Sequence, residues 1–366
     1  MAEATPVSQR PAVSVIVPAR NEEACLDACL QSLAAQTGVN CEIVVVDDSS
    51  TDSTREIARS FPGVTLVDAR PLPSGWSGKN NALVTGARQA SGEWLLFTDA
   101  DTVHLPGSLA RALGEAIERR ASLLSYSPAQ AVESLSEKAV MPVIFAELAA
   151  SYRPSQVSDP KSSAAAANGQ YLLISREAYD AVGGHKAIAT SLLEDVALAR
   201  AVKRSGRRIF FRYGGDAVRT HMYRSYAQLK EGWTKNLVLL FPSPVRLALL
   251  RITEFLLIMC STILAGVGLA EQRKQVAVLM AAAALCFYGL LIRRIRKAHF
   301  FWDANLLSVF GLPLFSYLLL RSKIAHREGA VTWKGRTYDR PQPEPMTGRR
   351  DIKGNDASNM KRAVSR

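Results

Sequence analysis

The chain has 366 residues and a formal net charge of +12, and 48% of its residues are hydrophobic. That length exceeds one average domain, so we expect one main domain with an appendage. The basic residues gather beside apolar stretches and in the C-terminal tail, and they do not interleave with aromatic residues on one element. This distribution excludes nucleic acid as a partner and favours anionic lipid headgroups.

The cysteines and the N-terminus indicate the compartment. Five cysteines without paired metal-ligand spacing fit a reducing environment rather than a disulfide or zinc framework. Residues 1–10 are polar and lack the apolar core of a signal peptide. We therefore expect a flexible N-terminus at 1–10 and a cytosolic domain that occupies residues 11–240.

Short β-branched runs alternate with helical apolar spacing in the N-terminal half. The expected strands are 13–17, 42–46, 64–67, 94–98 and 122–125, and the expected helices are 22–35, 53–60, 79–90 and 106–119. This alternation predicts an α/β fold, with a mainly parallel sheet and helices on both faces. Residues 126–235 are less regular and are interpreted as the acceptor-side half of the same domain.

Three apolar stretches follow, at 252–270, 276–292 and 300–320. The first two are about long enough to cross ~30 Å of hydrocarbon. Polar or helix-disrupting residues interrupt the third, which favours a re-entrant segment or a pair of short interfacial helices. A third crossing would also place basic residues between 321 and 336 outside, against the positive-inside tendency.

These observations predict a multi-pass protein of the cell membrane with its catalytic domain on the cytoplasmic side. The membrane region spans 241–325 and contains two crossings plus a re-entrant or third segment. A juxtamembrane segment is expected at 326–340, followed by a disordered basic tail at 341–366.

The strongest chemical signal is an apolar strand that ends in Asp99, Ala100 and Asp101. Two carboxylates at one strand end supply the oxygen ligands that Mg²⁺ or Mn²⁺ prefers when it bridges phosphate oxygens. An isolated pair of this kind would more often form a solvated turn. Two further acidic turns at neighbouring strand ends favour a metal site here, with Asp101 and Asp99 as its ligands.

The second acidic turn contains Asp47 and Asp48, and both are expected to contact a ligand, Asp48 more directly. The following Asp52 is better suited to capping the next helix. The third turn consists of Pro18, Ala19, Arg20, Asn21 and Glu22. Asn21 or Glu22 can contact a ribose or base while also serving the N-terminus of a helix.

Together these turns resemble the family 2 glycosyltransferases, whose nucleotide-binding half has the same order of motifs over about residues 13–236. The resemblance implies a Rossmann-like GT-A fold, a divalent cation and inversion at the anomeric carbon. It also implies a nucleotide-diphosphate sugar donor, with UDP-sugars ranked ahead of GDP-sugars. The residues of the three turns would then bind this donor.

A loop at residues 75–80 narrows the resemblance to membrane enzymes that glycosylate hopanoids, carotenoids or ceramide. Its Lys79 is expected at a helix N-terminus, where it can pair with a diphosphate. A solvated lysine is the other interpretation. Glu194 and Asp195 match the family's acidic pair, which implies that Asp195 is the general base and that Glu194 orients it or the acceptor.

Three residues are weaker candidates for contact with an acceptor or a phosphate. His221 precedes a segment in which processive relatives carry Gln-x-x-Arg-Trp, but this chain has Gln228 and Trp233 without the matching arginine. That departure favours one sugar added to a membrane lipid. Trp233 is equally interpreted as a membrane-interface anchor. Arg336 would reach the site if the juxtamembrane segment folds back, as its resemblance to the lipid-glycosylating group implies.

The sequence leaves other functions open. One is a polysaccharide or polyprenyl-phosphate sugar synthase of the same fold, and another is a non-catalytic membrane scaffold that retains the fold. A nucleotidyl- or phosphoryl-transferase is disfavoured because no G-x-x-x-x-G-K-[ST] loop is present.

Overall fold

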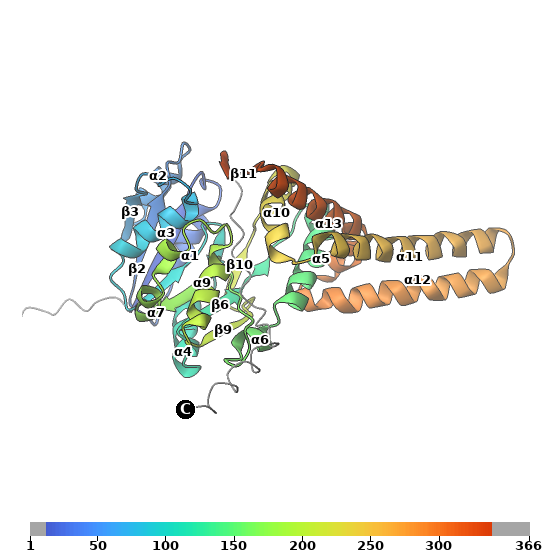
Figure 1. Ribbon diagram of the computed structural model, residues 1–366, viewed down its shortest axis with the longest axis horizontal. Coiled ribbons are helices and arrows are strands. Elements are labelled where there is room, and N and C mark those ends of the chain that lie inside the picture. The colour runs from blue at the N-terminus through green and yellow to red at the C-terminus, as the bar shows by residue number, and fades with distance from the viewer. Residues whose placement is uncertain (1–11, 339–366) are drawn as a thin grey trace, which may run out of the picture.

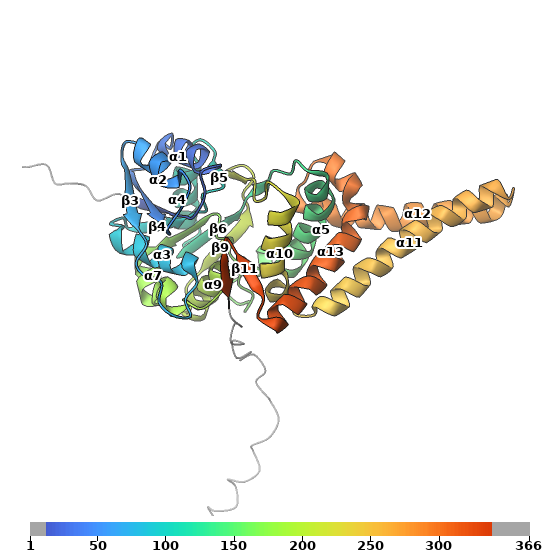
Figure 2. The same cartoon turned by 90° about the horizontal axis from the view of Figure 1, so that it is seen from above.

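A computed structural model describes residues 12–338. The expectations for residues 1–10 and for the tail at 341–366 lie outside the described residues. Within the described range, an α/β domain with helices on both faces of its sheet is followed by a helical region. A long helical hairpin projects from this region (Figures 1 and 2).

A seven-stranded sheet forms the centre of the α/β domain. In spatial order its strands are β3 (Val64–Asp68), β2 (Cys41–Asp47), β1 (Val13–Ala19), β4 (Trp94–Phe97), β8 (Leu172–Ser175), β6 (Leu123–Ser127) and β9 (Ile209–Tyr213). Every neighbouring pair is parallel except the two that involve β8. The expected mainly parallel sheet is therefore confirmed, and all five expected strands are present.

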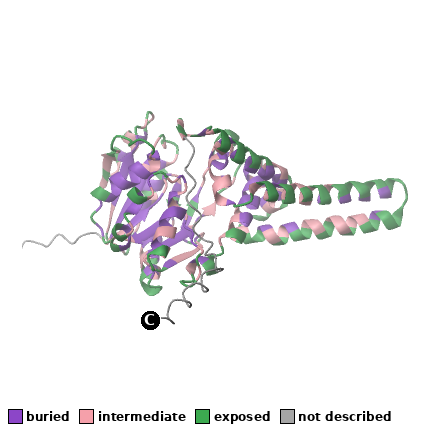
Figure 3. Cartoon of the chain, in the orientation of Figure 1, coloured by how far each residue is buried: buried purple, intermediate pink, exposed green. Residues whose placement is uncertain are grey.

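Helices cover both faces of this sheet because successive strand residues point to opposite sides. One face packs against α1 (Leu26–Ala34), α2 (Thr54–Ser60) and α4 (Ser108–Glu118). The other packs against α3 (Gly78–Gln89), α7 (Arg176–Ala181) and α9 (Glu194–Arg204), and the short α8 (Gly184–Ala187) lies beside α3. Figure 3 shows the resulting buried layer running through the sheet.

The strand β8 positions the site, and the sequence did not predict it. Because β8 runs antiparallel between β4 and β6, the turn that precedes it lies at the carboxyl ends of its parallel neighbours. A small second sheet, made of β5 (Thr102–His104), β10 (Val218–Thr220) and β7 (Ala129–Gln130), closes the same edge.

A separate apolar core holds the helical region together beside the α/β domain. It contains side chains from α5 (Leu135–Ser151), α10 (Tyr226–Leu240), α11 (Pro244–Ala270), α12 (Lys274–Ile295) and α13 (Trp302–Glu328). The short α6 (Pro154–Ser158) lies against β9. After α13, the strands β11 (Val331–Trp333) and β12 (Arg336–Tyr338) form an antiparallel hairpin.

Helices α11 and α12 form the projecting hairpin, and the 3₁₀ turn η1 (Arg296–Ala298) ends it. Both helices are long and apolar enough to cross a membrane, and so is α13. Only 22% and 11% of the most apolar windows of α11 and α12 are buried, compared with 50% for α13. The hairpin is thus exposed along most of its length, as Figure 3 shows, whereas α13 packs against the body.

The expected pair of short helices is wrong, because α13 is one continuous helix that contains Pro313. Two of the polar residues near its start find partners without a break in the helix. Asp303 forms a 2.8 Å ion pair with Lys138 of α5, and the Asn305 amide donates to the carbonyl of Phe300. Tertiary contacts therefore hold together a helix that its sequence alone would interrupt.

Four charged side chains meet where the hairpin leaves the body. Arg251 of α11 contacts Glu147 of α5 at 3.0 Å and Glu254 at 2.7 Å. Arg294 of α12 contacts Glu254 at 2.8 Å. This root cluster of Glu147, Arg251, Glu254 and Arg294 has no net formal charge and joins both helices of the projecting hairpin to α5.

Candidate active site

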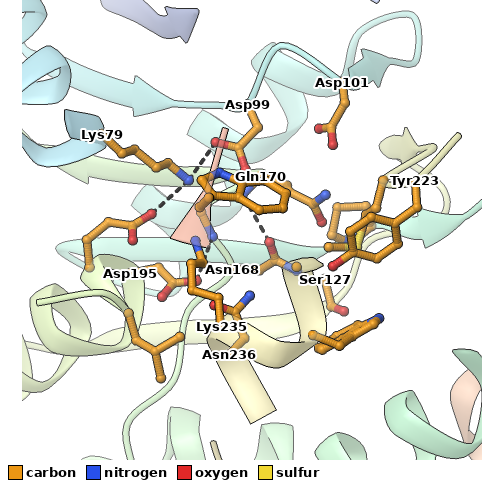
Figure 4. Close-up of a pocket in the computed structure, with 18 of the residues that line it drawn as sticks. Lys79, Asp99, Asp101, Ser127, Asn168, Gln170, Asp195, Tyr223, Lys235 and Asn236 are labelled. Atoms are coloured by element: carbon orange, nitrogen blue, oxygen red, sulfur yellow. Dashed lines mark hydrogen bonds and ion pairs between the residues drawn. The ribbon is translucent and has the colours of Figure 1, made fainter. Parts of the chain in front are cut away.

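The carboxyl ends of β1, β2 and β4 open into one cavity of about 830 Å³. Every residue that the sequence singled out as a site candidate lines this cavity, with the exception of Asp47. Figure 4 shows Lys79, Asp99 and Asp195 pointing into it, with Asp101 farther along toward Tyr223. The geometry thus brings together residues from distant parts of the chain.

The N-terminus of α3 is built by the motif at 77–80. The Ser77 hydroxyl caps the helix by accepting from the Asn80 backbone N–H at 3.1 Å. The Asn80 side-chain amide contacts three carbonyls of the loop at 188–191, which precedes α9. These contacts fix Lys79 between the carboxyl ends of the central strands and the N-terminus of α9.

Lys79 bridges two carboxylates, because its Nζ lies 2.7 Å from Asp99 Oδ1 and 2.7 Å from Glu194 Oε1. Burial disfavours the charged ammonium, but the two carboxylates more than offset this and raise the pKa of Lys79 well above its usual value. Burial likewise opposes ionisation of Glu194, yet Lys79 holds the pKa of Glu194 below its usual value. Lys79 and Glu194 are therefore both charged at neutral pH.

Asp101 differs from Asp99 because it forms no ion pair within residues 12–338. Its carboxylate accepts only a 3.3 Å hydrogen bond from the neighbouring Thr102 hydroxyl. Its backbone carbonyl is held by the Thr220 hydroxyl at 3.2 Å, and Thr220 accepts from the Gln170 amide at 3.0 Å. Desolvation by burial, followed by the charge of Asp99, raises the pKa of Asp101 to about 7.

Asp195 opens α9 and faces the turn before β8. Its Oδ2 accepts from the Gly169 N–H at 2.9 Å, and its Oδ1 accepts from the Val196 N–H at 2.7 Å. Burial is the main reason, and the nearby Glu194 the second, that the pKa of Asp195 is raised to about 6. A carboxylate that ionises near neutral pH suits a general base.

The two aspartates at the end of β2 point in different directions. Asp47 is buried, and its partners are Arg55 at 2.7 Å and the Ser50 N–H. It does not line the cavity, so the expected ligand contact is replaced by a structural one. Asp48 lies in the cavity, where it meets Arg336 of β12.

The β11–β12 hairpin folds back over the turn at residues 18–22, as expected if the juxtamembrane segment returns to the site. The Lys334 ammonium pairs with the Glu22 carboxylate and donates to the Arg20 carbonyl at 3.1 Å. Arg20 in turn donates to the Asp48 carbonyl at 2.7 Å. The hairpin is therefore bound to the strand ends by charged contacts.

Arg336 completes this arrangement with a two-pronged contact to Asp48, one arm of which is 3.0 Å long. Its guanidinium lies directly against the N-terminus of α3. A Cβ at Gly78 would lie 1.7 Å from Arg336 Nη1, so a larger residue there would require the Arg336 side chain to move. The glycine after the capping serine thus leaves room for the guanidinium.

In the part of the cavity lined by α10, the structure corrects the interpretation of one residue. It also shows two lining residues that the sequence analysis did not single out. Trp233 is 3% exposed and packs edge-on against Phe145, which excludes the interface-anchor interpretation. His221 lines the cavity with Nε2 3.5 Å from Glu137. The missed residues, Lys235 and Asn236, also line the cavity, and the Asn236 Oδ1 is buried without a hydrogen-bond partner. They lie two and three residues after Trp233, and this closeness is the signal that could have identified them.

The cavity continues away from the carboxylates toward the base of the projecting α11–α12 hairpin. Its lining there includes Phe145 and Leu148 of α5 and Ala298 of η1. At this end the His299 ring stacks on Tyr213 at a centroid distance of 4.0 Å. One cavity therefore connects the polar strand ends with the root of two apolar helices.

The fold and the carboxylates at its strand ends define a glycosyltransferase of the GT-A type. The structure is similar to the mannosyltransferase PcManGT from Pyrobaculum calidifontis, solved in complex with GDP-Man and Mn²⁺. The TM-score is 0.50 at 18% identity, and 87% of each chain is covered, a likeness that shows the fold.

Sequence comparisons identify the family. The model described as glycosyl transferase family 2 matches residues 14–183. The chain is also 30% identical over 336 residues to the 4,4'-diaponeurosporenoate glycosyltransferase of Staphylococcus aureus, which covers 89% of this chain and 88% of the relative. The chain therefore belongs to glycosyltransferase family 2, and the resemblance drawn from its motifs is confirmed.

Proposed function

We propose that this glycosyltransferase moves a sugar from a nucleotide-diphosphate sugar to a hydroxyl or carboxyl group of a membrane lipid, with inversion. The observation that carries the proposal is the single cavity, which joins Asp99, Asp101 and Asp195 to the root of the α11–α12 hairpin. A lipid acceptor can then reach the carboxylates while its apolar part stays near the membrane. The name of the Staphylococcus aureus relative, a glycosyltransferase for 4,4'-diaponeurosporenoate, supports this acceptor class.

Asp195 is proposed as the general base, because inversion requires one carboxylate that removes the acceptor proton as the new C1–O bond forms. The two backbone N–H groups fix its orientation. Lys79, at the N-terminus of α3, stabilises negative charge on the departing diphosphate. Glu194 holds Lys79 in place through their 2.7 Å ion pair.

A divalent cation fits the residues at the end of β4. Residues 12–338 contain no cluster of three or more His, Cys, Asp or Glu side chains that could hold a metal by themselves. Mg²⁺ is commonly held by one or two carboxylates together with substrate phosphates, and the unpaired Asp101 beside Asp99 matches that pattern. When bound, Mg²⁺ or Mn²⁺ would supply positive charge against the diphosphate. The Mn²⁺ in the PcManGT complex supports this assignment.

The remaining strand-end residues form the proposed donor site. Residues 18–22, Asp48 and Ala100 surround the part of the cavity nearest β1 and β2. Asp48 would accept hydrogen bonds from the nucleoside, in place of or together with Arg336. The ranking of UDP ahead of GDP stays a prediction, and so do the domain limits at 11–240, 241–325 and 326–340.

A second candidate within the same family is a polysaccharide or polyprenyl-phosphate sugar synthase. The cavity would admit either acceptor, but the missing arginine between Gln228 and Trp233 favours a single transfer. The cytoplasmic placement of the catalytic domain also stays a proposal. It is supported by the basic residues 293, 294, 296 and 297, which follow the second apolar helix on the catalytic side.

The proposal is tested with the full chain in lipid nanodiscs. Transfer from radiolabelled UDP- and GDP-sugars to extracted membrane lipids is measured with Mn²⁺, with Mg²⁺ and with a chelator. We expect labelled glycolipid only when a divalent cation is present, and none from the matched Asp195→Asn protein. Labelled polymer in place of glycolipid would instead support the synthase. Hydrolysis of the donor without formation of any glycosylated lipid would contradict the lipid-acceptor proposal.

A further inference from the structure

Both ends of α13 are held on the catalytic side of the protein. At its start, Asp303 pairs with Lys138 of α5, and the preceding His299 stacks on Tyr213 of β9. Beyond its end, Arg336 contacts Asp48 of the central sheet. The chain therefore enters and leaves α13 on one side, although α13 is long enough to cross a bilayer.

One face of α13 is built into the body. A Cβ at Gly311 would lie 1.9 Å from the Ala139 carbonyl oxygen, so α13 and α5 pack backbone against backbone. The Ser316 hydroxyl donates to the Ala248 carbonyl of α11 at 3.0 Å. The Ser322 hydroxyl accepts from the backbone N–H of Val238 in α10 at 3.0 Å. Figure 2 shows α13 beside α5 and α10, while α11 and α12 project away.

The opposite face of α13 carries an outward stripe of large apolar side chains. The six exposed members are Trp302, Leu306, Phe310, Tyr317, Leu320 and Ile324. At about 100° per residue these positions fall within an arc of about 80° and extend over about 33 Å. Such a long apolar stripe on an otherwise packed helix indicates a partner that covers it.

We propose that α13 does not cross the membrane but lies along its catalytic-side surface, with the outward stripe in the boundary between lipid headgroups and acyl chains. The occupant of the stripe is the bilayer, because the stripe is continuous with the root of two exposed apolar helices. Exposed Arg321, at the edge of the stripe, would reach anionic headgroups.

A crossing α13 would carry its packing partners with it. Helices α5 and α10 hold polar and charged side chains such as Lys138, Glu231 and Asn236, which hydrocarbon would strongly disfavour. The surface position avoids this cost. It also places η1 and the apolar end of the cavity at the membrane surface. A lipid can then enter the cavity directly from the bilayer.

The depth of α13 can be measured in a cysteine-free background reconstituted in phosphatidylcholine and phosphatidylglycerol vesicles. Leu306→Cys, Tyr317→Cys and Ile324→Cys are labelled with an environment-sensitive fluorophore, with Leu264→Cys in α11 as the control. Quenching is compared between lipids that carry a nitroxide near the headgroup and lipids that carry it deep in the acyl chain. Only variants whose circular dichroism spectrum and melting temperature are close to those of the native protein are used, because these measurements show that the variant is folded.

We expect all three α13 positions to be quenched more strongly by the shallow nitroxide and Leu264 by the deep one. If Tyr317 behaves like Leu264 while Leu306 and Ile324 are shallow, α13 crosses the membrane and the proposal is wrong. If none of the three α13 positions is quenched by lipid, the stripe faces water or protein and the proposal is equally wrong.

Sidedness gives an independent check that does not depend on catalysis. Lys323→Cys in α13 and Glu177→Cys in α7 should react with a membrane-impermeant maleimide from the same side of sealed vesicles. Gln272→Cys, between α11 and α12, should react only from the other side. Labelling of Lys323→Cys together with Gln272→Cys would overturn the proposal, whether or not the enzyme transfers sugar to lipid.

Discussion

Replacing Asp195 with asparagine tests the proposed chemistry most directly. The substitution keeps the shape of the side chain but removes the basic oxygen. The carboxylate now accepts from Gly169 at 2.9 Å and from Val196 at 2.7 Å, whereas an amide oxygen can replace only one of these acceptors in place. One weakened hydrogen bond costs roughly 0.5–1.5 kcal/mol, so the variant should still fold.

The expected loss of activity is much larger than this structural cost. A positioned general base typically contributes about 10²- to 10⁴-fold, so kcat should fall by that factor, equivalent to about 2.7–5.4 kcal/mol in the barrier. Donor affinity, measured by calorimetric titration, should change little because Asp195 lies on the acceptor side. A variant with near-native kcat would remove Asp195 as the base.

The same assignment predicts how kcat of the wild-type enzyme changes with pH: it should fall as the pH is lowered. A base must be ionised, and the pKa of Asp195 is raised to about 6. At pH 5 about one in ten of these groups is ionised, compared with about nine in ten at pH 7, so kcat should fall about tenfold per unit below pH 6. The Asp195→Asn profile should lack this limb. If the Asp195→Asn enzyme kept the same fall in kcat below pH 6 and the Glu194→Gln enzyme lost it, Glu194 would be the base instead of Asp195.

Three further predictions concern single positions. Asp101→Ala should weaken Mn²⁺-dependent binding of UDP at least tenfold, and an unchanged titration with and without Mn²⁺ would contradict the metal assignment. Gly78→Ala places a methyl 1.7 Å from an Arg336 nitrogen, so the Arg336 guanidinium must move away from its position against Asp48 and the amide hydrogens of the β11–β12 hairpin should exchange faster than in the native protein. Gly311→Ala should lower the melting temperature, since overpacking costs roughly 1–3 kcal/mol, whereas Gly289→Ala, with no atom within 4 Å of the new methyl, should leave it unchanged.

Local patterns predicted the donor half of the domain well. The β-branched runs at β1, β2 and β4 mark buried parallel strands, and the polar turns that follow them had to meet at one edge of the sheet. The expected helices end within a few residues of α1 to α4 because their apolar spacing faces the sheet. Here local sequence and global packing agree.

Other features depend on contacts that no local pattern encodes. Two adjacent aspartates at a strand end point to opposite sides, where Asp47 is buried against Arg55 and Asp48 faces the cavity beside Arg336. The antiparallel β8 comes from a segment without strong periodicity. Trp233 looked suited to a membrane edge, but α5 supplies the partner that buries it.

The root cluster of Glu147, Arg251, Glu254 and Arg294 has a consequence for which molecules the enzyme can serve. Swinging the projecting hairpin would pull apart opposite charges in a poorly hydrated setting, which is strongly unfavourable. If α11 and α12 cross the membrane as proposed, they would hold the carboxylates at a set height above the hydrocarbon. The proposed lipid acceptors would then be selected by how far the reactive oxygen extends from the bilayer.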